Sequence, residues 1–132
     1  MRRSLWALLL VAVLAAGCNS EPANYKAEPT GKCLRDKLHY LVITDPALLG
    51  VVEGSAARGG LLVHHPGNAI RIAFGLNADD VPGIEAGFRR FAPLKLRPHI
   101  DDVMRNNKNV VFLWTVSPSQ EEINAVFGCL KG

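Results

Sequence analysis

The chain has 132 residues, of which 48% are hydrophobic, and a formal net charge of +3. This length is enough for one domain with a substantial core. Arg2 and Arg3 are two of the fifteen basic residues, and without them thirteen basic residues face twelve acidic ones. Nucleic-acid-binding domains normally carry a strong positive excess, so a near-neutral domain argues against nucleic acid as a partner.

The first 18 residues are organised like an export signal. Arg2 and Arg3 form a basic start, residues 5–16 carry no charge, and small residues stand directly before Cys18. A helix of about twelve residues is too short for the ~30 Å hydrocarbon core of a membrane. We therefore predict a signal peptide over residues 1–17 and not a membrane-spanning segment.

The segment Ala15-Ala16-Gly17-Cys18 resembles the lipobox of bacterial lipoproteins. The resemblance implies cleavage before Cys18 and lipidation of this cysteine with a diacylglycerol and an amide-linked chain such as palmitate. Several acyl chains together anchor a protein stably in a membrane. Asn19 stands where an Asp often retains such lipoproteins in the inner membrane, which implies the periplasmic side of the outer membrane in a cell with two membranes. An ordinary secretory signal that leaves Cys18 unmodified is the alternative.

Residues 18–31 are polar, contain two prolines, and are predicted to be the lipidated cysteine and a flexible tether. Residues 32–132 are predicted to form a single globular domain. Cys33 and Cys129 lie near its two ends, and exported proteins meet an oxidising compartment, so we predict a disulfide between them. Two buried thiols or a metal pair are the alternatives, although cysteines without CxxC spacing make a poor zinc site.

The first predicted elements lie before residue 75. Strand-forming residues predict a strand over 38–44, and a proline at position 46 predicts a short helix over 46–52. Residues 61–65 and 69–74 flank the segment His65-Pro66-Gly67-Asn68. Proline followed by glycine suits the centre of a type II turn, so these residues predict a β-hairpin.

Three helices and one strand are predicted in the second half. A helix begins near Pro82 and ends before Pro93, and a shorter helix runs from Pro98 to a close at Asn106-Asn107. Residues 110–116 predict a central strand covered on both faces. The segment Ser117-Pro118-Ser119-Gln120 predicts the cap of a last helix, with Ser117 as the cap. The apolar stripes of these helices are Ile84, Phe88 and Phe91, then Ile100, Val103 and Met104, then Ile123, Val126, Phe127 and Leu130.

This order of elements predicts an α+β fold. We expect about four strands in an antiparallel or mixed sheet with helices on one face. A ferredoxin-like β-α-β-β-α-β arrangement with an added C-terminal helix is one candidate topology.

No arrangement of residues requires catalysis, a metal or another cofactor. His64 and His65 are adjacent on a predicted strand and point to opposite faces, which does not suit one metal ion. Paired carboxylates stand near predicted helix starts, where capping and the helix dipole explain them. A small envelope hydrolase would need one of the histidines to meet one of these carboxylates, namely Asp79, Asp80, Asp101 or Asp102.

The sequence therefore predicts a non-enzymatic, lipid-anchored envelope module that binds a protein or a polymer. One basic segment could meet an anionic polymer or an acidic protein if its side chains share a face, and it contains Arg89, Arg90, Lys95, Arg97, Arg105 and Lys108. A solvated helix surface is the alternative reading of these charges. The small hydrolase and an inhibitor or immunity-type lipoprotein are alternative functions, and the latter would bind through the glycine-bearing segment Gly54 to Gly60.

Overall fold

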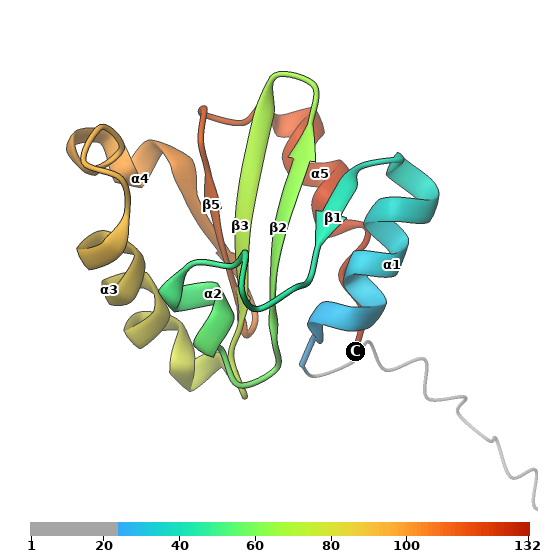
Figure 1. The fold of residues 1–132 in the computed structure, drawn as a ribbon, viewed down its shortest axis with the longest axis horizontal. Coiled ribbons are helices and arrows are strands. Elements are labelled where there is room, and N and C mark those ends of the chain that lie inside the picture. Colours follow the sequence, from blue (N-terminus) through green and yellow to red (C-terminus); the bar gives the residue numbers. More distant parts are fainter. Residues whose placement is uncertain (1–23) are drawn as a thin grey trace, which may run out of the picture.

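A five-stranded antiparallel sheet forms the centre of the fold (Figure 1). The computed structural model describes residues 24–132. The strand order is β1-β2-β3-β5-β4, and every neighbouring pair is antiparallel. The strands are β1 Leu41–Ile43, β2 Gly60–His65, β3 Asn68–Phe74, β4 Met104–Asn107 and β5 Val110–Trp114. The predicted α+β class and antiparallel sheet are confirmed.

Helices pack against this sheet, and those between strands lie in the connections from β1 to β2 and from β3 to β4. The longest are α1 Ala27–Leu38, α3 Val81–Phe91 and α5 Gln120–Phe127. Two shorter helices are α2 Val51–Ser55 and α4 Ile100–Val103, and the 3-10 turns are η1 Ala78–Asp80 and η2 Arg97–His99. None of the helices within residues 24–132 combines the length and the apolar character that crossing a membrane requires.

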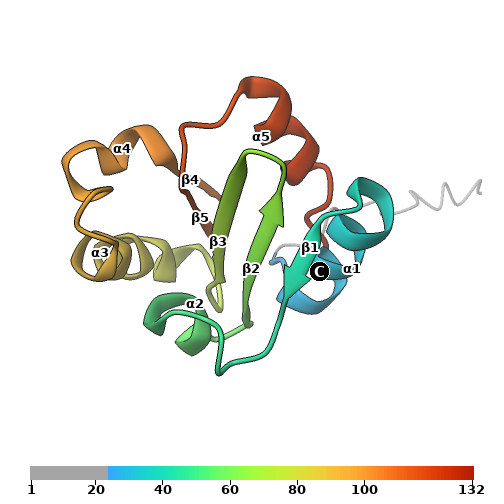
Figure 2. The same cartoon turned by 45° about the horizontal axis from the view of Figure 1, so that its top comes forward.

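The helices α1 and α5 cover one face of the sheet (Figure 2). Leu61, Ile72 and Phe112 are successive cross-strand partners and therefore share this face. Gly31 of α1 lies against Leu61, and Phe127 of α5 packs on Phe112 with ring centroids 5.0 Å apart.

The opposite face is covered by α2 and α3. Arg71 is adjacent to Ile72 on β3 and so points to this other face, where its Nη1 lies 3.0 Å from Oε1 of Glu53 in α2. Gly87 of α3 packs on Val52 of α2. The expectation that the helices lie on one face was wrong, because both faces of the central strands are apolar and each needs a cover.

The topology also excludes the ferredoxin-like candidate. A split β-α-β unit inserts a strand between the two strands that its helix connects. Here the connection that contains α2 joins β1 and β2, which are direct antiparallel neighbours. The sheet is instead built from adjacent strands and two hairpins.

The hairpin around Pro66-Gly67 forms as predicted, with Gly67 at φ 84° in the second central position. The central strand β5 is buried along its whole length but ends at Trp114, not at 116. The fifth strand, β4, was missed: Asn106 and Asn107, which were expected to end a helix, pair with Val111 and Val110. Their polar side chains suit an edge strand and give no alternating apolar signal.

Several predicted boundaries also differ. The helix expected over 46–52 begins only at Val51, and the strand expected over 38–44 is limited to 41–43 because α1 continues to Leu38. The last helix is capped by Ser119, whose hydroxyl accepts a hydrogen bond from the N–H of Glu122, and not by Ser117. Phe91 was expected in the core and is exposed.

The folded part also begins earlier than expected. Residues 27–31 were assigned to the tether, but they form the first turns of α1. Tyr25, Ala27 and Thr30 are buried, so these residues belong to the core and not to a linker.

Candidate functional site

The predicted lipidation site, Cys18, lies outside the described residues, so the structure does not bear on it. Residues 24–132 do contain the two cysteines of the predicted disulfide and the histidines, carboxylates and basic residues that the sequence analysis considered.

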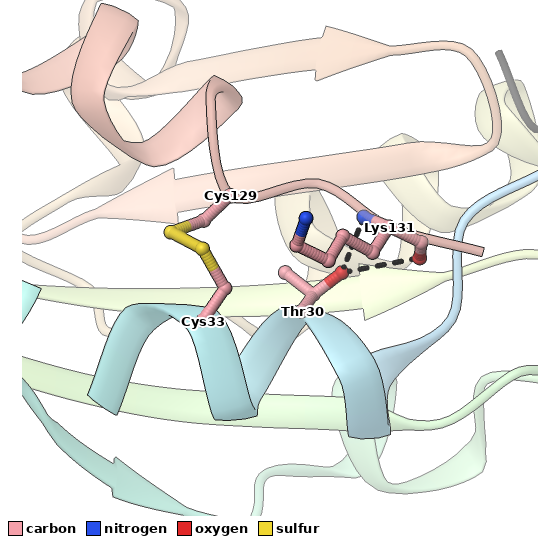
Figure 3. Close-up of a disulfide and its surroundings, with 4 residues drawn as sticks. All are labelled: Thr30, Cys33, Cys129 and Lys131. Atoms are coloured by element: carbon pink, nitrogen blue, oxygen red, sulfur yellow. Dashed lines mark hydrogen bonds between the residues drawn. A yellow bond between two sulfur atoms is a disulfide. The ribbon is translucent and has the colours of Figure 1, made fainter. Parts of the chain in front are cut away.

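Cys33 and Cys129 form the predicted disulfide, with their Cα atoms 5.3 Å apart. Cys33 lies on α1 and Cys129 follows α5, and both are buried (Figure 3). Beside the disulfide, Thr30 Oγ1 accepts a hydrogen bond from Lys131 N at 3.0 Å and donates one to Lys131 O at 3.3 Å. The beginning and the end of the described chain are therefore joined by covalent and polar contacts.

His64 and His65 point to opposite faces, and they differ in exposure. His64 is exposed, whereas the side chain of His65 is only 6% exposed and stacks on Tyr40 with ring centroids 4.6 Å apart. The Nε2 atom of His65 lies 3.8 Å from Oε2 of Glu122, beyond hydrogen-bond distance. Burial, followed by the charge of Glu122, raises the pKa of Tyr40.

Two of the four carboxylates considered for catalysis have partners other than the histidines. Asp80 accepts a hydrogen bond from Leu76 N at 2.7 Å, and Asp101 lies 2.6 Å from Arg89. Asp79 and Asp80 form η1, and Asp101 and Asp102 form the first turn of α4. Within the described part of the chain, no hydrogen bond or ion pair joins either histidine to any of them, and no group of three or more His, Cys, Asp or Glu side chains could hold a metal ion.

The basic residues of the second half do not act as one cluster. Arg105 donates hydrogen bonds to the carbonyls of Asp101, Asp102 and Met104, and the ammonium of Lys108 lies 5.1 Å from the ring centre of Tyr25. Arg90 and Arg97 instead gather at the end of α3, where Arg97 donates to the Arg90 carbonyl.

A groove of about 600 Å³ lies between α1 and the segment 44–60. We call it the α1 groove. One wall carries four charged side chains of α1, and the other is formed by small or apolar residues. The lining residues are Ala27, Glu28, Lys32, Arg35, Asp36, Thr44, Pro46, Leu49, Gly54, Gly59 and Gly60.

The second wall of the α1 groove contains three glycines, which have no side chain to project into the groove. Gly59 has φ 92°, and a Cβ on Gly60 would lie 2.0 Å from the carbonyl oxygen of Glu53. Both positions therefore require glycine. Of the segment Gly54 to Gly60, expected as a binding loop, the three glycines line this groove, whereas residues 55–57 line a groove on another surface.

The charged side chains of the α1 groove are ordered along the helix with an acidic residue at each end, Glu28 and Asp36, and Lys32 and Arg35 between them. Lys32 and Asp36 form an exposed ion pair with a 2.8 Å separation, and the hydrogen bond from Lys32 lowers the pKa of Asp36. Glu28 and Arg35 form no ion pair with any described residue. The sequence analysis missed this row because residues up to 31 were assigned to the tether, although the i, i+4 spacing of Glu28, Lys32 and Asp36 is a helical signal.

A second surface, between α2 and α3, is apolar. Two adjoining grooves of about 320 and 400 Å³ share Val51 and Phe91 in their linings. We call the exposed side chains of Leu48, Val51, Phe91 and Leu94, together with these grooves, the α2–α3 surface. Glu53 forms part of its floor, where its carboxylate accepts hydrogen bonds from Gly50 N at 2.6 Å and Arg71 at 3.0 Å.

Comparisons with protein-family models, with curated proteins and with solved structures find no match for the chain. A function must therefore be inferred from the residues at the N-terminus and from these two surfaces.

Proposed function

We propose that the chain is a lipid-anchored protein of a bacterial envelope whose domain binds a charged peptide segment of a partner in the α1 groove. The observation that carries the binding role is this groove of about 600 Å³, whose α1 wall presents charges of both signs and leaves Glu28 and Arg35 without an ion pair. The anchor is supported by the lipobox-like segment that ends at Cys18. Asn19 supports the outer membrane, facing the periplasm, as its location.

The disulfide is consistent with an exported protein. Disulfides persist in oxidising compartments and are rare in the cytosol. Cys33 and Cys129 are the two cysteines that remain when Cys18 is acylated, and they pair with each other. Every cysteine thus has a role in an exported lipoprotein.

The spacing of charges in the α1 groove sets the class of partner. Glu28 and Arg35 are separated by seven residues of α1, which corresponds to about 10 Å along the helix axis. An extended peptide covers this distance in about three residues. A segment with a cationic group at one end and an anionic group at the other would satisfy both side chains, while Pro46 and Leu49 offer contacts for its apolar part.

The small-hydrolase alternative gains no support from the placement of its residues. His65 is buried against Tyr40, and the carboxylate nearest to its Nε2 atom is that of Glu122, at 3.8 Å. An inhibitor or immunity-type lipoprotein remains compatible with the α1 groove, since such a protein would also act by binding a segment of another protein.

Two measurements test the proposal. Mass spectrometry of the protein from bacterial membranes should find an acylated Cys18 as the N-terminal residue, and a retained Met1 or an unmodified cysteine would contradict the anchor. Affinity capture from envelope extract should then compare the mature chain with the variant Glu28→Lys/Arg35→Glu.

The matched control for this capture is Lys37→Glu/Glu121→Lys, which exchanges two exposed charges outside the groove and leaves the net charge unchanged. The proposal expects a protein that is captured by the wild type and the control but not by the groove variant. Identical sets of captured proteins for all three would show that the α1 groove does not bind the partner.

A further inference from the structure

The α2–α3 surface gathers most of the exposed large apolar side chains of the described residues. Leu48, Val51, Phe91 and Leu94 are between 53% and 75% exposed, and they come from two short segments, 48–51 and 91–94. Val51 and Phe91 bring these segments together, because both line the same two grooves. A cluster of this kind, unlike apolar residues scattered singly, indicates an interaction surface.

The rim of this surface beside Phe91 is basic. Residues 86–100 contain Arg89, Arg90, Lys95 and Arg97 and no Asp or Glu. The Arg90 guanidinium lies 5.3 Å from the centre of the Phe91 ring. Arg97 is held beside it by hydrogen bonds to the carbonyls of Ala92, at 3.0 Å, and Arg90, at 2.8 Å.

Four acidic groups lie near this surface, and ion pairs neutralise two of them together with Arg71 and Arg89. Glu53 is buried and pairs with Arg71, and Asp101 pairs with Arg89. Asp80 lines the far end of the 400 Å³ groove, and Asp45 precedes Leu48. The basic groups therefore dominate on the side of Phe91 and Leu94, and this side complements an anionic surface.

The chain enters the fold beside this surface. Ala27 N donates a hydrogen bond to Arg58 O at 3.1 Å, and residues 55–57, directly before Arg58, line the 400 Å³ groove. Figure 1 shows the beginning of α1 and α2 toward the same end of the sheet. Six residues lie between Cys18 and the buried Tyr25, and a fully extended chain over these seven steps spans at most about 25 Å.

We infer that the α2–α3 surface rests on the anionic phospholipids of the membrane that holds Cys18, with its four exposed apolar side chains entering the headgroup region. This inference rests on the proposed lipid anchor. Apolar side chains flanked by Lys and Arg are the features by which proteins bind membrane interfaces. The anchor raises the local concentration of lipid, so that a weak surface becomes sufficient. In this orientation the membrane fixes the domain instead of leaving it to rotate about its linker.

Vesicle binding without the anchor tests the surface directly. The mature chain with Cys18→Ser keeps every residue that the structure describes. At low ionic strength it should sediment with vesicles of 30% phosphatidylglycerol in phosphatidylcholine roughly tenfold more strongly than with pure phosphatidylcholine. Added salt should reduce this binding.

The variant Phe91→Ser/Leu94→Ser should lose this binding about tenfold or more, whereas Leu41→Ser/Val116→Ser, which removes two comparably exposed apolar side chains elsewhere, should retain it. All four positions are exposed, so the fold should survive, as an intact Cys33–Cys129 disulfide and an unchanged circular dichroism spectrum would show. Equal binding by both variants, or none by the parent chain, would overturn the inference. A dimer in solution that only Phe91→Ser/Leu94→Ser abolishes would also overturn it and assign the surface to a second copy of the chain.

A second measurement uses the acylated protein in vesicles. Phe91→Trp should show fluorescence that brominated phosphatidylcholine quenches, while the native Trp114 is buried and supplies a protected background. Leu41→Trp is the matched control and should remain unquenched. Absence of quenching at position 91 would overturn the inference, whereas an unmodified Cys18 would overturn the anchor and leave the vesicle-binding result standing.

Discussion

Tyr25 and Asn109 are joined by a reciprocal pair of buried hydrogen bonds, although 84 residues separate them. The side-chain oxygen of Asn109 accepts from Tyr25 N at 2.8 Å, and its amide donates to Tyr25 O at 2.9 Å and to Gly75 O at 2.8 Å. This one side chain therefore fixes the beginning of the folded chain to the turn between β4 and β5 and to the end of β3.

We predict that Asn109→Ala lowers the free energy of unfolding by about 2–4 kcal/mol, because three buried backbone groups lose their partner. Urea unfolding followed by circular dichroism measures this change. Asn106→Ala is the control, since its side chain bonds only to the exposed Glu85 and its loss should cost less than about 1 kcal/mol. Equal effects at the two positions would contradict the role given to Asn109.

Removal of the disulfide should lower the free energy of unfolding more than removal of any single polar contact. The disulfide closes a loop with a sequence separation of 96 residues. In the chain-entropy model, a loop of this size contributes about 4–5 kcal/mol by restricting the unfolded state. We expect Cys33→Ala/Cys129→Ala to lower the unfolding free energy by this order, and thiol labelling of the denatured, unreduced wild type to leave both cysteines unmodified. Two labelled thiols would show that the bond does not form.

The hairpin and the central strand could be predicted because their signals are local. Pro66-Gly67 specifies the turn by its allowed dihedral angles, and residues 110–114 have no polar side chain. β4 gave no such signal, because Arg105, Asn106 and Asn107 are polar and the strand exists only through its pairing with β5. Neighbouring structure overrides local preference in such a strand.

The beginning of α1 was missed for a similar reason. Pro29 and Gly31 are poor residues for a helix, yet Pro29 lies in the first turn, where its missing N–H is not needed. Gly31 lies where a Cβ would come within 3.2 Å of Leu61 and 3.3 Å of Val42, so its small size allows α1 to approach the sheet. The α1 groove depends on this close packing of α1 on the sheet, and it therefore could not be predicted from the sequence.

The α2–α3 surface was hidden because Phe91 continues the apolar stripe of α3. Periodicity places Phe91 with Ile84 and Phe88, but only Phe88 of the three is fully buried. The surrounding structure leaves Phe91 53% exposed, and a helical pattern does not contain that information.

The buried carboxylate of Glu53 supports this surface and offers another prediction. Glu53 holds Gly50 N and Arg71 in place, and Arg71 is partly exposed. Glu53→Ala should lower the unfolding free energy by about 3 kcal/mol, because it leaves a guanidinium and a backbone N–H without their acceptor. Glu85→Ala, which changes an exposed carboxylate, should have an effect below about 1 kcal/mol. A small effect at Glu53 would show that water replaces the carboxylate at no cost.

The raised pKa of Tyr40 leads to a prediction of how the free energy of unfolding changes at alkaline pH. Burial, reinforced by the charge of Glu122, raises the pKa of Tyr40 in the folded protein above 10.0, the usual value of a tyrosine. Above the unfolded pKa the unfolded state has released this proton while the folded state still holds it. The free energy of unfolding therefore falls as the pH rises through that range and levels off above the folded pKa.

Replacement of the Tyr40 phenol should remove the part of the alkaline decrease in unfolding free energy that this group causes. We expect the stability of Tyr40→Phe to fall less between about pH 9 and pH 11 than that of the wild type, as measured by urea unfolding at each pH. Phe keeps the ring that stacks on His65, so the two proteins should share the same fold at neutral pH. Parallel stability curves for the two proteins across this range would show that the Tyr40 phenol has the same pKa in both states. Exchange of Glu122 for Gln should shift the wild-type curve in the same direction as Tyr40→Phe but by less, because burial is the larger cause.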